Sequence, residues 1–154
     1  REFLINEIEI LNIKQLVRMK KENMNETEIK KHILYPKDQN SFKLLSIKKE
    51  QYEKIFKQNY KDMIETLLNT KFKIVVKKHM KSLELKESLV AFENDLDKYL
   101  LRKSLTLLHQ NPLSIDIILG YMFAKEIEVM NLKKLVKGKQ LGMSEEFISE
   151  QLIV

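Results

Sequence analysis

Apolar residues recur along most of this chain at the three- and four-residue spacing that is typical of one face of an α-helix. In residues 3–21 the apolar positions include Phe3, Leu4, Ile8, Leu11 and Val17. This pattern predicts a first helix over that range. Asn25 then occupies the position of an N-cap, with Glu28 three residues later in the capping-box position. We expect a second, short helix that ends near Leu34, because Pro36 follows.

The middle of the chain predicts shorter helices. Residues 37–47 are polar and typical of a turn, whereas apolar spacing resumes at residues 48–58 and 61–68. Residues 72–76 read Phe-Lys-Ile-Val-Val, and their β-branched side chains would also suit a strand. No partner strand is visible elsewhere in the sequence, so we predict a helix here as well.

The longest apolar seam predicts a helix over residues 84–109, ended by Asn111 and Pro112. Its members recur at alternating spacings of four and three residues: Leu85, Leu89, Phe92, Leu96 and Tyr99. Ser114 should cap the next helix, with Asp116 favourably placed near the positive end of the helix dipole.

The end of the chain predicts one more helix–turn–helix. The helix that begins after Ser114 should run to about Leu141, and Gly142 stands where a left-handed C-cap residue belongs. Ser144 should then open a last short helix with Glu145 and Glu146 in its first turn.

Composition supports an all-α fold. The 154 residues contain only 3 Gly and 2 Pro, too few for the many turns of an all-β protein, and they suffice for about one compact domain. The absence of Cys excludes a disulfide framework, a thiolate zinc site and a cysteine nucleophile. No apolar run is long enough to predict a membrane span. The chain begins with Arg1, and we expect it to be the C-terminal portion of a longer protein.

The two ends of the sequence repeat each other. Residues 7–34 align without gaps to residues 126–153, an offset of 126 − 7 = 119 positions. The identical pairs are Glu7/Glu126, Ile8/Ile127, Glu9/Glu128, Asn12/Asn131, Lys14/Lys133, Leu16/Leu135, Val17/Val136, Lys20/Lys139, Met24/Met143, Glu26/Glu145 and Ile29/Ile148. Such a repeat is a sign of architecture rather than of a catalytic site. We expect residues 1–36 to end one repeat and residues 37–154 to form a complete one.

The C-terminal segment contains the most specific residues. In chain order these are Asn111-Pro112-Leu113-Ser114, Gly120-Tyr121, Lys125 to Lys133, Lys139 and Gly142, followed by a Glu-rich helix. In this order and spacing they resemble the end of the C subunit of V/A-type rotary ATPases, the relative of the d subunit in the eukaryotic vacuolar enzyme. Residues 7–36 resemble the end of the preceding repeat in that family, and residues 37–110 share only helical character with it.

The resemblance implies a structural role. Proteins of this family are funnels of three similar helical bundles around a pseudo-threefold axis, bound peripherally at the cytoplasmic face of the membrane. The resemblance further implies partners: the D- and F-type subunits of the central stalk above and the membrane rotor ring below. It implies no nucleotide, cofactor or metal, and no catalysis by the protein itself. ATP synthesis and transport of protons or sodium ions are properties of the whole complex.

Candidate chemistry is sparse and favours structure. His32, His79 and His109 lack metal-ligand spacing, and no Gly-rich phosphate loop is present. Glu7, Glu9, Glu126 and Glu128 recur in both repeats and are expected to form ion pairs or cap neighbouring helix ends. Asn12 and Asn131 lie mid-helix, where Asn is a poor helix former, so a side-chain bond that fixes a helix crossing is expected. We therefore predict no catalytic, cofactor-binding or metal-binding residues.

The remaining patterns leave two other functions open. Lys71, Lys73, Lys77, Lys78 and Lys81 form the densest basic cluster, expected to be a solvated face. The methionines Met122, Met130 and Met143 are expected to fill the core. A helical adaptor in another assembly would fit the repeat equally well. A basic helical nucleic-acid-binding module is also possible, although the net charge of +6 is scattered and modest.

Overall fold

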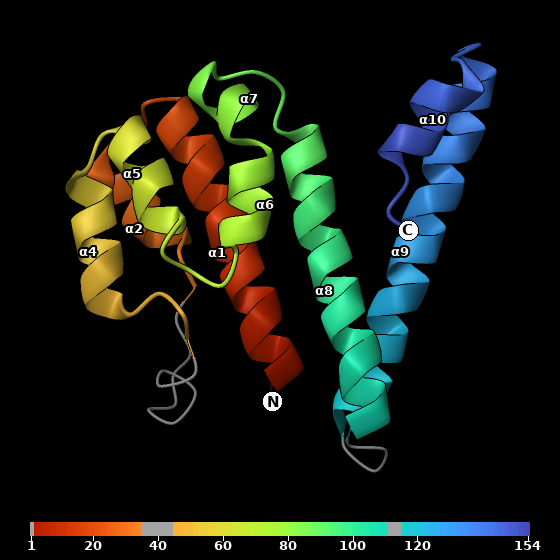
Figure 1. Cartoon of the computed structure of the whole chain (residues 1–154), viewed down its shortest axis with the longest axis horizontal. Coiled ribbons are helices and arrows are strands. Elements are labelled where there is room, and N and C mark those ends of the chain that lie inside the picture. Colours follow the sequence, from red (N-terminus) through yellow and green to blue (C-terminus); the bar gives the residue numbers. More distant parts are fainter. Residues whose placement is uncertain (1, 35–44, 111–114) are drawn as a thin grey trace. The chain divides into compact units, whose positions relative to one another are not determined.

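A computed structural model describes residues 2–34, 45–110 and 115–154 (Figure 1). These residues form nine helices and no strand, which confirms the all-α prediction. None of the helices in the described ranges is both long enough and apolar enough to cross a membrane. The prediction that Pro36 ends a helix, the polar turn at 37–44, and the cap at Ser114 fall outside the described residues.

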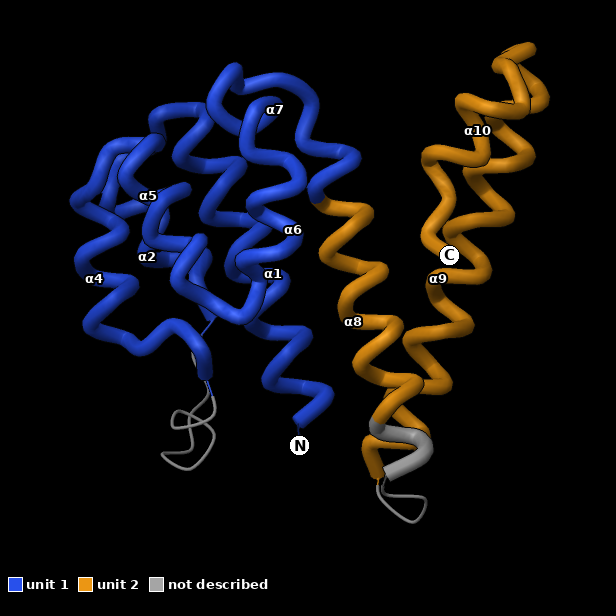
Figure 2. The backbone as a smooth tube through the Cα atoms, viewed as in Figure 1, with its two compact units in different colours: residues 1–92 blue, residues 93–154 orange. Residues whose placement is uncertain are grey.

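The chain divides into two compact units, residues 1–92 and 93–154 (Figure 2). The helices of the first unit are α1 (Glu2–Lys21), α2 (Glu26–His32), α4 (Lys49–Lys57), α5 (Tyr60–Leu67), α6 (Lys73–Lys78), α7 (Met80–Glu84) and the start of α8 (Val90–Gln110). The second unit contains the rest of α8, α9 (Ile115–Gln140) and α10 (Glu145–Gln151).

The first unit has a well-covered core. Helix α5 contacts α1, α4, α6 and α7, and α2 contacts both α1 and α4. Aromatic and aliphatic side chains at helical spacing fill the centre, among them Tyr52, Ile55, Met63, Leu67 and Phe72, all less than 2% exposed. The helical prediction for residues 72–76 is confirmed by α6, whose Val75 and Val76 are buried. Apolar burial of this kind stabilises the unit by roughly 25 cal/mol per Å².

The second unit is thinner. Leu96 and Leu100 of α8 are buried, and α8 approaches α9 closely at Gly120, where a Cβ atom would lie 3.3 Å from Cβ of Ser104. Lys134 of α9 donates to Oδ1 of Asn94 in α8 and to the carbonyl of Gln151 at the end of α10. A few contacts therefore join the three helices of this unit.

The predicted start of the helix over residues 84–109 was wrong. Helix α8 begins at Val90 rather than at residue 84, and Leu85 is 70% exposed instead of belonging to the seam. The physical reason is Lys86, whose φ of 54° lies in the left-handed region and ends the preceding short helix α7. At the start of α8, the Val90 N–H donates to Oγ of Ser88 at 3.4 Å.

Two smaller predictions also need correction. Asn25 is the N-cap of α2, but no side-chain capping bond forms there; the N–H of Glu28 donates to the backbone carbonyl of Asn25 instead. Met122 and Met143 do not fill a core: they are 62% and 41% exposed. The apolar surface of α9 extends beyond what its own unit covers.

Candidate functional site

The segments predicted to be repeats have the same helix boundaries. Helix α1 ends at Lys21 and α9 ends 119 residues later, at Gln140. Helix α2 spans Glu26–His32, and α10 spans the residues 119 positions later, Glu145–Gln151. The turns agree as well. Asn23 and Gly142, at equivalent positions, have φ values of 54° and 66°, so the left-handed conformation predicted for Gly142 is present in both.

The two turns also share their hydrogen bonds. The N–H of Met24 donates to the carbonyl of Met19 at 3.0 Å, and the N–H of Met143 donates to the carbonyl of Gly138 at 3.0 Å. Both turns therefore close with the six-to-one bond of a Schellman motif. This motif sets the angle at which the second helix leaves the first.

An asparagine in each first helix binds the extended segment that follows the second helix. Nδ2 of Asn12 donates to the Leu34 carbonyl at 2.7 Å, and the Leu34 N–H donates to Oδ1 of Asn12 at 2.8 Å. Asn131 makes the same two bonds with Ile153, at 2.8 and 2.9 Å. In both cases the partners are 22 residues apart. We call this pair of bonds the asparagine lock.

The lock explains why a poor helix former stands in the middle of a long helix. A carboxamide offers one donor and one acceptor, which match the N–H and the carbonyl of one backbone residue. Asn12 is 1% exposed and its Nδ2 also lies 3.5 Å from the hydroxyl of Tyr52. Asn131 is only half-buried. The lock therefore fixes the chain after the second helix against the middle of the first.

Glu9 is a second anchor in the first unit. This side chain is fully buried, and its Oε1 accepts from the N–H of Ser46, the hydroxyl of Ser46 at 2.8 Å and the N–H of Ile47 at 3.3 Å. Its Oε2 pairs with Nζ of Lys71, which also donates to Oδ1 of Asn6 at 2.5 Å. Glu9 therefore binds the chain as it enters α4 and holds it against α1.

The equivalent Glu128 lies in a different environment. Its carboxylate accepts from Nζ of Lys125 at 2.6 Å, and both side chains are more than half exposed. The hydrogen bond that Lys125 donates to Glu128 raises the pKa of Lys125. The other predicted pair lies differently in its two copies: Glu7 is half-buried and Glu126 is exposed. Both copies keep the carboxylates; Glu9 joins distant parts of the chain, whereas Glu128 pairs within α9.

Lys20 is an anchor that the sequence did not reveal. Its Nζ donates at 2.7 Å to the carbonyls of Phe56 and Gln58 at the end of α4, where helix carbonyls lack partners. Burial lowers the pKa of Lys20, and the nearby Glu26 opposes that shift. The equivalent Lys139 instead pairs with Glu145 at 2.5 Å and lowers the pKa of that carboxyl. The only sequence signal was the identity of the two lysines.

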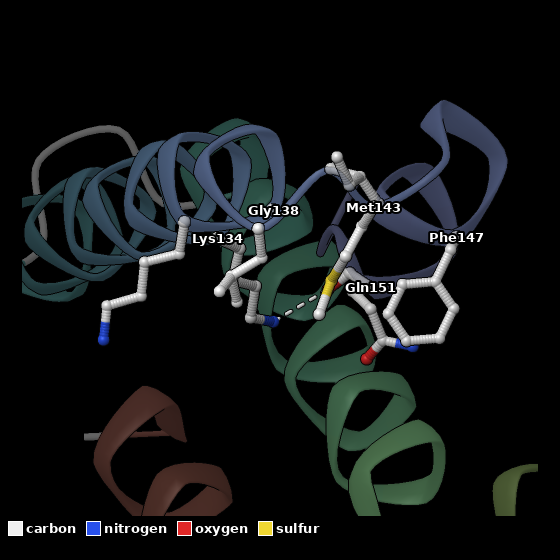
Figure 3. A pocket seen from close by; sticks show the side chains of 8 residues that line it. Lys134, Gly138, Met143, Phe147 and Gln151 are labelled. Carbon is white, nitrogen blue, oxygen red and sulfur yellow. Dashed lines mark hydrogen bonds between the residues drawn. The ribbon is translucent and has the colours of Figure 1, made fainter.

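A pocket of about 210 Å³ lies between α9 and α10 (Figure 3). It is lined by Lys134, Lys137, Gly138, Leu141, Met143, Phe147, Ile148 and Gln151. The two helices approach closely here, since a Cβ atom on Gly138 would lie 2.6 Å from Cγ1 of Ile148. The pocket is mainly apolar, with the Lys134 amine bound to the Gln151 carbonyl at its edge, so it offers contact area rather than reactive groups.

In the described ranges no three His, Cys, Asp or Glu side chains gather as a metal site would require. His32 is exposed, and the ring of His79 stands edge-on to Phe92 at 6.1 Å between centroids. Of the predicted motif residues, Glu9, Asn12 and Asn131 bind segments that are distant in sequence. Fold and site together define an all-helical protein that contains two equivalent helix–turn–helix units, α1–α2 and α9–α10.

Comparison with known proteins gives the family. The model for the ATP synthase (C/AC39) subunit family matches residues 1–151. The chain belongs to this family, which confirms the resemblance to the C subunit of V/A-type ATPases.

Several archaeal relatives are named as the C subunit of an A-type ATP synthase. That of Methanocaldococcus jannaschii is 28% identical over 153 residues, which is 99% of this chain and 37% of the relative. That of Haloquadratum walsbyi is 32% identical over 64% of this chain and 28% of the relative. The matched region thus spans 37% and 28% of the length of these two relatives. No solved structure matches it.

The asparagine lock predicts unequal effects in its two copies. Asn12→Ala should lower the free energy of unfolding by about 1–3 kcal/mol, because the Leu34 N–H and carbonyl would lose their partners. Asn131→Ala should cost less, because water reaches this half-buried site. Urea denaturation followed by circular dichroism measures both. Asn69→Ala, at an exposed turn position, is the control and should change stability by less than about 0.5 kcal/mol. Equal stability of Asn12→Ala and the control would refute the lock.

The two equivalent glutamates should differ even more. Glu9→Ala would remove the carboxylate that pairs with Lys71 and the acceptor of two backbone N–H groups, and loss of one partner from a buried ion pair costs about 3–5 kcal/mol. We expect the low end, because the Lys71 side chain is 27% exposed. Glu128→Ala should have little effect, because that pair is exposed. The comparison uses the same urea titrations, and similar midpoints for the two variants would contradict the assigned role of Glu9.

Proposed function

We propose that this chain is the C-terminal part of the subunit that couples the central stalk of a rotary ATPase to its membrane ring. The observation that carries the proposal is the family match across residues 1–151, together with the similarity of nearly the whole chain to the C subunit of the M. jannaschii A-type ATP synthase. In this proposal the protein is non-catalytic and transmits torque. Synthesis of ATP and transport of protons or sodium ions belong to the complex as a whole.

The structure suggests how such a part would work. A coupling protein must resist bending while the stalk turns, and densely packed helices deform little. Tyr52, Met63 and Leu67 are fully buried in the first unit. The asparagine locks and the Glu9 anchor add direct bonds between segments that are distant in sequence. Stiffness would then arise from the non-covalent core and from these bonds, without any reactive group.

The proposed partners are the D- and F-type subunits of the central stalk and the rotor ring, with this protein peripheral at the cytoplasmic face of the membrane. A stripe of exposed apolar side chains along α9 supports contacts with other proteins, since Met122, Val129 and Leu132 are each at least 49% exposed. Family membership favours this function over the helical adaptor and the nucleic-acid-binding module, which share only the helices and the charge.

The proposal predicts that core damage uncouples the enzyme. Leu96 is fully buried in α8, and Leu96→Ala should cost roughly 2–5 kcal/mol of stability. In reconstituted enzyme that carries this substitution, ATP hydrolysis should continue while ion pumping falls. Both rates are measured on the same vesicles. Lys103→Ala, an exposed position on the same helix, is the matched control and should leave both rates unchanged.

Two results would contradict this function. One is retained pumping in a Leu96→Ala enzyme that is measurably destabilised. The other is loss of hydrolysis by the detached catalytic head when this variant is added, because in the proposal that head works without this protein.

A further inference from the structure

The equivalent faces of α1 and α9 have the same chemistry but different burial. The α1 face consists of Phe3, Ile10, Ile13, Leu16 and Val17, each at most 3% exposed. Its counterpart, which we call the α9 face, consists of Met122, Val129, Leu132, Leu135 and Val136, each at least 40% exposed. All five positions are apolar in both copies. A stripe of exposed apolar side chains on one helix is typical of a binding surface.

The occupant of the α1 face is a defined segment of this chain. Helix α5 contacts α1, and α4 contacts both α2 and α5. Three polar groups of the first copy hold this segment: Glu9 binds its entry at Ser46 and Ile47, Asn12 lies beside the Tyr52 hydroxyl, and Lys20 binds the carbonyls at the end of α4. Residues 45–67 are therefore held by apolar packing and by three polar anchors.

The second copy retains all three anchors. Glu128, Asn131 and Lys139 stand at the positions of Glu9, Asn12 and Lys20. Within the described ranges, Glu128 and Lys139 make exposed ion pairs with nearby residues of α9 and α10, at 2.6 and 2.5 Å. Both ion pairs lie at the surface, so an incoming segment can reach the Glu128 carboxylate and the Lys139 amine.

We propose that the α9 face docks a two-helix segment of the α4–α5 type, supplied by another helical repeat of this family. Glu128 accepts hydrogen bonds from backbone N–H groups and a hydroxyl at the start of the first incoming helix. Lys139 donates hydrogen bonds to the carbonyls at the end of that helix. The five apolar residues of the α9 face pack against the pair. This inference rests on the internal repeat and holds whatever the assembled protein couples.

One difference between the copies specifies the partner further. In the first copy the cation beside Glu9 is Lys71, which also binds Asn6. The position equivalent to Asn6 is Lys125, and this lysine already pairs with Glu128 from within α9. The negative charge of Glu128 is therefore already paired with Lys125 before docking. The incoming segment needs no lysine at the position of Lys71, and its entry turn supplies neutral donors.

The chain itself provides a probe for this surface. Leu34 and Ile153 are equivalent positions in the two copies. A second copy of residues 35–92 can therefore be joined directly after Ile153, in place of Val154. The appended copy then stands in the same sequence relation to α9 as residues 35–92 do to α1. Amide hydrogen exchange over residues 122–136, read by mass spectrometry, reports whether the α9 face becomes covered. We expect exchange there to slow at least tenfold relative to the unextended chain.

Substitutions test whether docking uses the proposed anchor. In the extended chain, Glu128→Ala should abolish most of the slowing, whereas Glu126→Ala, an exposed carboxylate on the same helix, should preserve it. Glu128→Ala in the unextended chain should leave exchange unchanged, which separates docking from folding of α9.

Four outcomes would overturn the proposal. They are no slowing on extension, equal behaviour of the two glutamate variants, exchange in the unextended α9 already as slow as in α1, and slowing in the unextended chain that depends on protein concentration. The last would show that a second copy of the chain covers the α9 face.

Discussion

In each copy the architecture depends on one asparagine carboxamide, which must form hydrogen bonds with the N–H and the carbonyl of a residue 22 positions later. Asn12 and Asn131 can each reach both the N–H and the carbonyl of Leu34 or Ile153 only if the first helix ends where it does, the turn closes as a Schellman motif and the second helix is short. A turn of different length would leave a buried amide without partners, which costs about 1–3 kcal/mol. Identical helix boundaries in the two copies follow from this one requirement.

The same unit behaves differently according to what covers it. In the first copy Glu9 and Lys20 bind a distant segment, and apolar residues of α1 are buried beneath it. In the second copy Glu128 and Lys139 pair with residues of their own helix–turn–helix, and the apolar face of α9 is exposed. Repetition therefore gives one covered apolar face on α1 and one exposed apolar face on α9.

Sequence alone predicted the parts that depend on local chemistry. The all-α class, the α6 segment, the left-handed residue Gly142 and the Ser144 cap follow from spacing and from residue type. Lys86 could not be predicted as the break before α8, because lysine seldom adopts positive φ. The partners of Glu9 and Lys20 lie more than thirty residues away, and periodicity carries no signal for contacts of that range. Exposure of Met122 was missed because an apolar stripe does not reveal whether anything covers it.

The most direct test of the repeated lock is amide hydrogen exchange of Leu34 and Ile153, resolved by nuclear magnetic resonance. Both residues lie beyond the last turn of a helix, and Asn12 and Asn131 accept from their N–H groups. We predict that both amides exchange at least about tenfold more slowly than those of an unstructured chain, with Leu34 the slower because Asn12 is more deeply buried. Exchange of either amide at the unstructured rate, while α1 and α9 remain protected, would contradict the account.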